Sequence, residues 1–135
     1  MGDLSKNFNR SEFVCNHCGE LKLDPALLES MQALRDLAEK SIRITSAYRC
    51  PEHNKAIGGA RKSLHITGKA ADLVIKGMTI KEMFDHVIQI QAFADGGIGV
   101  YSGFVHVDTR GRKARWGRIG GKYVNWSKAV NHFDL

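Results

Sequence analysis

Apolar residues in the first third of the chain recur at the spacing of one helix face. They follow Asp24 and Pro25, a pair typical of a helix N-cap with proline at the first helical position. The apolar positions are Leu27, Leu28, Met31, Leu34 and Leu37. This pattern predicts a helix from about residue 25 to residue 40.

A second helix is predicted after the cap residue Thr79, with Ile80, Met83, Phe84, Val87 and Ile90 facing inward. Strands are predicted upstream at "IRIT" and "ADLVI", because both runs are short and largely apolar or β-branched. The segment "SAYRCPEHN" between them is predicted to be a loop, since Pro51 prevents the first strand from continuing.

The runs "GGIGVY" and "FVHVDT" predict a hairpin that turns at Ser102 and Gly103, and "ARW" predicts a short strand. These elements predict an α+β fold in which a small antiparallel sheet packs against two main helices. One domain is expected over residues 1–135, with an N-terminal arm at 1–20 and an unassigned C-terminal tail at 119–135.

The size and composition of the chain, 135 residues with 43% hydrophobic and 25% charged, suit a single globular domain. Its net charge of +6 favours an anionic partner such as nucleic acid, a membrane surface or a cell-wall polymer. No apolar run is long enough to span a bilayer, and "MGDLSKNFNRSEF" lacks the apolar core of a secretory signal. We therefore expect that the protein is made in the cytoplasm and does not insert into a membrane.

Polar side chains share one face of two predicted strands. Alternation along a strand turns Asp72, and likewise His106 and Asp108, away from their apolar neighbours. A buried carboxylate needs a cation or strong donors. Together with His65 on the preceding loop, these strands supply two imidazoles and a carboxylate, a ligand set that leaves an open position on a catalytic zinc ion. The alternative is that each is an ordinary structural residue.

The residues of the motif S-x-H-x-x-G-x-A-x-D are Ser63, His65, Gly68, Ala70 and Asp72, and His106 follows on a later strand. The surrounding sequence, from about residue 11 to residue 116, resembles the zinc D-alanyl-D-alanine carboxypeptidase family, which includes phage endolysins and cell-wall endopeptidases. The small residues between His65 and Asp72 are expected to let the loop backbone approach the metal and the substrate.

The resemblance implies that His65, Asp72 and His106 ligate zinc. It also implies that Arg49 contacts the substrate or developing negative charge, for which a guanidinium is well suited. The alternative for Arg49 is a surface ion pair. Ser63 either binds substrate or caps the local turn.

The sequence departs from the family pattern at Gly103, where many relatives carry an acidic general base three residues before the last zinc histidine. Asp108 is the first candidate for the base because it shares a strand face with His106, and Asp95 is the second. Asp108 could instead orient a ligand or pair with Arg110 or Arg112.

The resemblance implies a zinc metallopeptidase that hydrolyses peptidoglycan stem peptides or cross-links, as a D-Ala-D-Ala carboxypeptidase or an endolysin-type endopeptidase. We expect a monomer that acts on the cell wall, with phage or prophage release as the route. The basic cluster suits an anionic wall, or is simply a solvated surface, and it comprises Arg110, Arg112, Lys113, Arg115 and Arg118.

The motifs "CNHC" and "CPEH" offer Cys15, Cys18, Cys50 and His53 in two pairs with the spacing of a structural zinc site. The alternatives are buried free thiols, or a disulfide to Cys50.

Two other classes of function are open. A non-catalytic zinc-containing cell-wall binding module, with a site like that of hedgehog signalling domains, would keep the ligands without turnover. A nucleic-acid binder would explain the basic residues, but no helix-turn-helix, finger or stacking-strand motif is present, so we expect no nucleic-acid partner.

Overall fold

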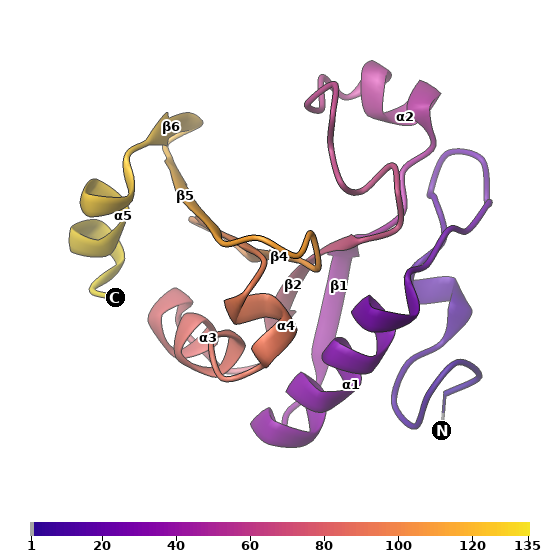
Figure 1. Cartoon of the computed structure of the whole chain (residues 1–135), viewed down its shortest axis with the longest axis horizontal. Helices are drawn as coiled ribbons and strands as arrows, with labels where there is room; N and C mark the ends of the chain where they lie inside the picture. The colour runs from indigo at the N-terminus through magenta and orange to yellow at the C-terminus, as the bar shows by residue number, and fades with distance from the viewer. Residues whose placement is uncertain (1) are drawn as a thin grey trace.

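A computed structural model describes residues 2–135, which form a sheet covered on one face by helices (Figure 1). The sheet has six strands in the order β1-β2-β4-β3-β5-β6. The strands are β1 (Ile42–Ser46), β2 (Ala70–Ile75), β3 (Gly97–Tyr101), β4 (Val105–Asp108), β5 (Ala114–Ile119) and β6 (Lys122–Val124). The predicted α+β class is confirmed.

The sheet is mixed, whereas the sequence suggested an antiparallel one. Strands β3 and β5 pair in parallel, and every other neighbouring pair is antiparallel. After β4 the chain passes the start of β3 through residues 109–113 and begins β5 beside Gly97. The predicted hairpin of β3 and β4 is confirmed, and the Tyr101 N–H closes it by donating to the Phe104 carbonyl at 3.0 Å.

Helices α1 (Pro25–Ala38), α3 (Ile80–Val87) and α4 (Gln91–Ala94) lie on the same side of the sheet (Figure 1). Their apolar side chains meet those that β2, β3 and β4 direct toward them. The fully buried members of this core include Leu27, Met31, Leu34, Leu73, Ile75, Val87, Phe93, Ile98, Val105 and Val107. Packing this face leaves the opposite face of the same strands to carry polar groups.

Local capping explains where the two predicted helices begin. The Asp24 carboxylate accepts from the Ala26 N–H at 3.1 Å, and the Thr79 hydroxyl accepts from the Glu82 N–H at 3.2 Å. The second helix ends at Val87, earlier than its periodicity suggested, because the chain turns before α4 begins at Gln91.

Besides α4 and a single 3-10 turn at Arg10–Glu12, three elements were not anticipated from the sequence. The predicted loop after β1 contains helix α2 (Pro51–Ala56), which has proline at its first position. The unassigned tail forms β6 and helix α5 (Trp126–Phe133). Helix α5 packs against β5, and the Trp126 ring lies 5.6 Å from that of Phe84 on α3. Among residues 2–135, no helix is both long and apolar enough to cross a bilayer.

Gly68 has a structural role that the sequence did not predict. Its φ angle is +74°, and a Cβ there would lie 2.4 Å from the Lys22 carbonyl oxygen. The Asp24 N–H donates to the Gly68 carbonyl at 2.9 Å. The glycine therefore lets the His65 loop pack against the backbone that leads into α1.

Candidate metal centre

Two neighbouring strands place a carboxylate and an imidazole side by side. Asp72 on β2 is paired directly with His106 on β4, and both point to the face opposite the helices. Directly paired residues have Cβ atoms about 4.5–5.5 Å apart. The sheet register alone therefore brings two candidate ligands together.

His65 reaches this pair from the loop before β2. The loop is fixed to the segment after β1, because the Arg49 N–H donates to the His65 carbonyl at 3.1 Å. The His65 ring adds a second bond to that segment, from Nδ1 to the Ala47 carbonyl at 2.6 Å. A carbonyl can only accept, so Nδ1 carries a proton and Nε2 is the ring nitrogen that faces Asp72.

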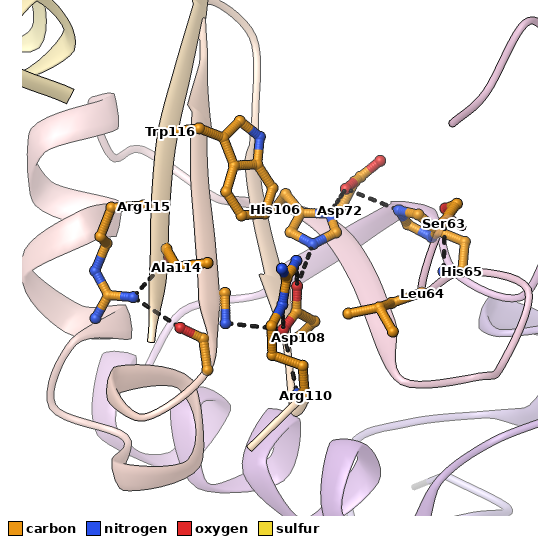
Figure 2. A network of polar contacts seen from close by, with 12 residues as sticks. Ser63, Leu64, His65, Asp72, His106, Asp108, Arg110, Ala114, Arg115 and Trp116 are labelled. Atoms are coloured by element: carbon orange, nitrogen blue, oxygen red, sulfur yellow. Dashed lines mark hydrogen bonds and ion pairs between the residues drawn. The ribbon is translucent and has the colours of Figure 1, made fainter. Parts of the chain in front are cut away.

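The three side chains converge on one oxygen. His65 Nε2 lies 3.3 Å from Asp72 Oδ1, and His106 Nδ1 lies 3.0 Å from the same atom. Figure 2 shows this meeting point, where the donor atoms of all three residues lie within 4.8 Å of one another. Each residue is less than 9% exposed. The three side chains could hold a divalent metal ion, with two imidazoles and one carboxylate as ligands.

Asp108 holds the far side of the His106 ring. His106 Nε2 donates to Asp108 Oδ2 at 2.8 Å, which leaves Nδ1 as the atom that faces Asp72 (Figure 2). Arg110 clamps the same carboxylate, with Nε 2.9 Å from Oδ1 and Nη2 2.8 Å from Oδ2. Carboxylates behind metal-binding histidines commonly fix the ring in this way.

Asp108 is saturated with donors. Besides His106 and Arg110, its Oδ1 accepts from the Gly97 N–H at 2.8 Å, and the side chain is fully buried. Burial alone would raise the pKa of Asp108, but the hydrogen bonds from His106 and Arg110 outweigh it and hold the pKa well below its usual range. The carboxylate is therefore firmly ionised.

The other two polar groups are also shifted. Burial opposes charge on Asp72, yet hydrogen bonds from His106 and His65 lower the pKa of this carboxylate. Burial likewise opposes protonation of His106, and hydrogen bonds to Asp108 and Asp72 raise its pKa nonetheless. These hydrogen bonds thus favour the ionised form of Asp72 and the protonated form of His106.

Two glycines of "GGIG" make room for this arrangement. A Cβ on Gly97 would lie 2.2 Å from Asp108 Oδ2, and a Cβ on Gly99 would lie 2.5 Å from the Trp116 ring. Gly99 is the sheet neighbour of both His106 and Trp116, so its missing side chain lets their rings approach to 4.9 Å. The sequence analysis did not predict either role. The repeated glycines within a predicted strand were the feature that could have indicated close packing there.

Replacing Gly97 with alanine is therefore expected to displace Asp108 and release the His106 ring. Loss of such an outer partner typically weakens metal binding by about 10–100-fold. Competition with a chromophoric chelator measures this change. Gly103→Ala is the matched control, because a Cβ at Gly103 meets nothing within 4 Å. Equal zinc affinity in the two folded variants would contradict the role given to Asp108.

The three candidate ligands open into a cleft with a volume of about 710 Å³. Its walls combine the His65 loop with the outer strands, and they carry positive and aromatic side chains. These are Arg49, Lys62, Tyr101, Phe104, Arg110, Arg112, Trp116, Arg118 and Tyr123. Among the described residues that line it, Asp72 is the single carboxylate. Positive side chains therefore outnumber negative ones in the lining of the cleft.

Arg49 lies in this cleft with part of its hydrogen-bonding capacity unused. Its Nη1 donates to the Asn54 side chain at 2.9 Å, and its buried Nε has no partner among the described residues. The surface ion pair considered as its alternative is not among the ion pairs of the described chain. An unsatisfied guanidinium beside a metal centre suits a ligand carboxylate or oxyanion.

Of the two remaining residues predicted for the site, one lines the cleft and the other does not. Ser63 lines the cleft, and its hydroxyl accepts from the His65 N–H at 3.3 Å, so it caps the turn. Asp95 lies at the end of α4, where it accepts from Gln91 at 2.9 Å, and it does not line the cleft.

Tyr101, which was not predicted as a site residue, lies in the cleft, and burial raises its pKa to about 12. It stays a neutral hydroxyl at physiological pH.

The predicted basic cluster divides into two groups. Arg110 holds Asp108 (Figure 2), and Arg115 donates to the carbonyls of Gly96 and Ala94, each at 2.8 Å. These two are structural. Arg112 and Arg118 line the cleft, as Arg110 also does, whereas Lys113 is exposed and does not line it.

The family model of peptidase M15 matches residues 6–108, which span the whole centre from Arg49 to Asp108. The chain belongs to the peptidase M15 family. The family suggested by the sequence motif is thereby confirmed. Members of peptidase M15 depend on zinc, which agrees with the ligand set gathered here.

Relatives of this M15 chain include the peptidoglycan L,D-endopeptidase MepK of Escherichia coli strain K12, 32% identical over 96 residues that cover 64% of the chain and 51% of the relative. MepK of Shigella flexneri gives the same values. The probable peptidoglycan L,D-endopeptidase MepK of Haemophilus influenzae is 32% identical over 98 residues, covering 65% and 51%. The chain therefore spans about half the length of the curated relatives it matches.

Proposed function

We propose that this chain is a zinc metallopeptidase that hydrolyses peptide bonds of peptidoglycan. The observation that carries the proposal is the convergence of His65, Asp72 and His106 at the floor of a cationic cleft. Membership of peptidase M15 and similarity to the MepK endopeptidases support it. Whether the enzyme trims terminal D-alanine or cuts within stems or cross-links depends on the shape of the cleft ends, and the relatives favour internal cleavage.

The side chains present fit a zinc ion. Each imidazole has one nitrogen fixed by an acceptor, the Ala47 carbonyl or the Asp108 carboxylate, and directs the other toward Asp72 Oδ1. Zinc bound by these three ligands would supply Lewis-acid chemistry, polarising the scissile carbonyl and acidifying a water molecule. Preorganised ligands of this kind need little rearrangement on binding.

We assign Asp108 a positioning role, which is one of the two roles its sequence position suggested. A general base works best when its pKa lies near the working pH and an oxygen is free to accept a proton. Asp108 is instead fully buried, firmly ionised and occupied by His106, Arg110 and Gly97. Its contacts support the orientation of His106 over direct proton transfer.

Arg49 is proposed to bind the substrate. Its unpartnered Nε and its place in the cleft suit either a substrate carboxylate or the oxyanion that forms during amide hydrolysis. Arg112, Arg118 and Lys62 extend the positive surface along the cleft and would attract the carboxylates of stem peptides. Ser63 has its hydroxyl proton available for a substrate contact.

One observation favours a second candidate, a non-catalytic wall-binding module. Among the described cleft residues no carboxylate other than Asp72 is present, so no spare acidic side chain stands ready as a general base. Such a module would keep the metal centre and the basic cleft but would leave the peptides intact. Phage origin, action on the wall after release and the monomeric state remain predictions.

The test is digestion of purified peptidoglycan with zinc-loaded protein, followed by mass spectrometry of the muropeptides. New fragments that differ by the elements of water, and that disappear after zinc removal, are the expected result. The fragment masses identify the bond cut. Binding to the wall with unchanged fragment masses would overturn the peptidase proposal and favour the binding module.

A further inference from the structure

A second group of possible metal ligands lies outside the cleft and shares no residue with the first. The sulfur atoms of Cys15, Cys18 and Cys50 lie within 4.8 Å of one another. Cys15 and Cys18 come from the N-terminal segment, and Cys50 precedes helix α2. Cys15 is 1% exposed and Cys50 is 7% exposed, whereas Cys18 faces solvent. Residues 35 positions apart in the sequence thus direct thiols to one point.

The local backbone already has the form of a thiolate site. Cys15 and Cys18 flank a tight turn, in which the Gly19 N–H donates to the Cys15 carbonyl at 2.8 Å and Gly19 has a φ of +72°. The Cys50 N–H points at Cys15 Sγ and the His53 N–H at Cys50 Sγ, both at 3.4 Å. N–H groups directed at sulfur stabilise the thiolate form that binds metal.

The number of thiols argues against a disulfide as the purpose of the cluster. All three cysteines are free, and any one disulfide would leave a third sulfur unpaired beside it. Three cysteines complete a tetrahedral zinc site when one imidazole is added. His17 lies between Cys15 and Cys18 in the sequence, His53 is three residues after Cys50, and the two rings stack at 5.6 Å. Neither belongs to the tight three-sulfur group, so the expected His53 ligand is one of two candidates.

We propose that Cys15, Cys18 and Cys50 hold a structural zinc ion, with an imidazole from the His17 and His53 pair as the fourth ligand. Four protein ligands close such a site to water, and its role is to stabilise the fold. The region needs this support because its own core is small. It consists of Cys15, Tyr48 and Cys50 with Leu21 packed against them.

This zinc ion would also brace the cleft. Cys50 follows Arg49 directly, and the Tyr48 N–H donates to the Phe13 carbonyl at 3.1 Å, close to Cys15. The same segment holds His65 through Ala47 and Arg49. A metal ion at the cysteines would thus fix the N-terminal segment to the strand end that positions both the histidine ligand and the cleft arginine. This consequence for catalysis rests on the proposed function, whereas the metal site itself does not.

Cobalt substitution distinguishes the two centres, because only thiolate ligands give an intense sulfur-to-cobalt charge-transfer absorption in the near ultraviolet. The experiment compares the full chain with Cys18→Ser and His106→Ala, each kept reduced with a phosphine. The wild-type and His106→Ala proteins are expected to show the thiolate band and to bind zinc at the cysteines. Cys18→Ser is expected to lose the band together with about one equivalent of zinc.

A rescue variant separates ligation from folding. Cys18 is exposed, so Cys18→Ser should leave the core intact. Cys18→His supplies a different ligand at the same place and is expected to retain zinc and its thermal stabilisation by zinc, with a weaker thiolate band. Absence of the band in reduced, cobalt-loaded wild-type protein would overturn the proposal. So would a Cys18→Ser protein that binds as much zinc as the wild type. A protein that keeps the thiolate band but lacks peptidase activity would support the cysteine site and contradict the proposed function.

Discussion

Replacing His106 with alanine is expected to abolish peptidoglycan hydrolysis and to remove zinc from the cleft. The imidazole supplies one of three ligand atoms, and its Nδ1 lies 3.0 Å from the Asp72 oxygen on which the site converges. Loss of a residue that hydrogen-bonds a metal ligand weakens metal binding by about 10–100-fold. Loss of the ligand itself should weaken it by more. Muropeptide mass spectrometry and zinc content, measured on the same preparation, give the two readouts.

His132→Ala is the matched control for this experiment. His132 lies on α5, is exposed and does not line the cleft, so its removal should change neither hydrolysis nor zinc content. Circular dichroism establishes that both variants are folded. Retained hydrolysis in folded His106→Ala protein would show that His106 is not a ligand of the catalytic metal.

Replacing Arg49 with alanine is expected to lower kcat while leaving zinc in place. The guanidinium lies in the cleft, and its Nε has no partner among the described residues. Arg49 supplies none of the three candidate ligand atoms, so its removal should leave the metal site intact. Removing one donor to a developing oxyanion costs about 10²–10³-fold in kcat. Steady-state cleavage of a defined stem peptide, together with zinc analysis, measures both quantities.

Two further variants test the assignment of Arg49. Arg49→Lys keeps the charge but loses the planar fork, so it should recover only part of the rate. Arg43→Ala removes an exposed arginine from β1 and should have no effect. A rise in KM at constant kcat would point to ground-state substrate binding. Unchanged kinetics in Arg49→Ala would contradict any role in substrate or transition-state binding.

Two of the three candidate metal ligands could be predicted because their placement follows from strand alternation. Two-residue periodicity places Asp72, His106 and Asp108 on one face, and the structure pairs Asp72 with His106 directly. The spacing from His65 to Asp72 supplied the family motif. The α+β class and both main helices likewise follow from apolar periodicity and from caps that the residues themselves provide.

Other features depend on contacts between segments that sequence patterns do not connect. The saturation of Asp108 arises from Gly97 on another strand, and the parallel pairing of β3 with β5 depends on how the chain passes the sheet edge. Helix α2 has only six residues, too few for a periodic signal. The structural role of Gly68 could not be predicted, because its packing partner, Lys22, lies in a loop.

The most direct test of the account is anomalous diffraction from zinc-loaded crystals, recorded above and below the zinc absorption edge. A zinc peak is expected in the cleft, bonded to His65 Nε2, Asp72 Oδ1 and His106 Nδ1 at roughly 2.0–2.2 Å. A cleft without such a peak in crystals of zinc-loaded protein, or a peak ligated by other residues, would contradict it.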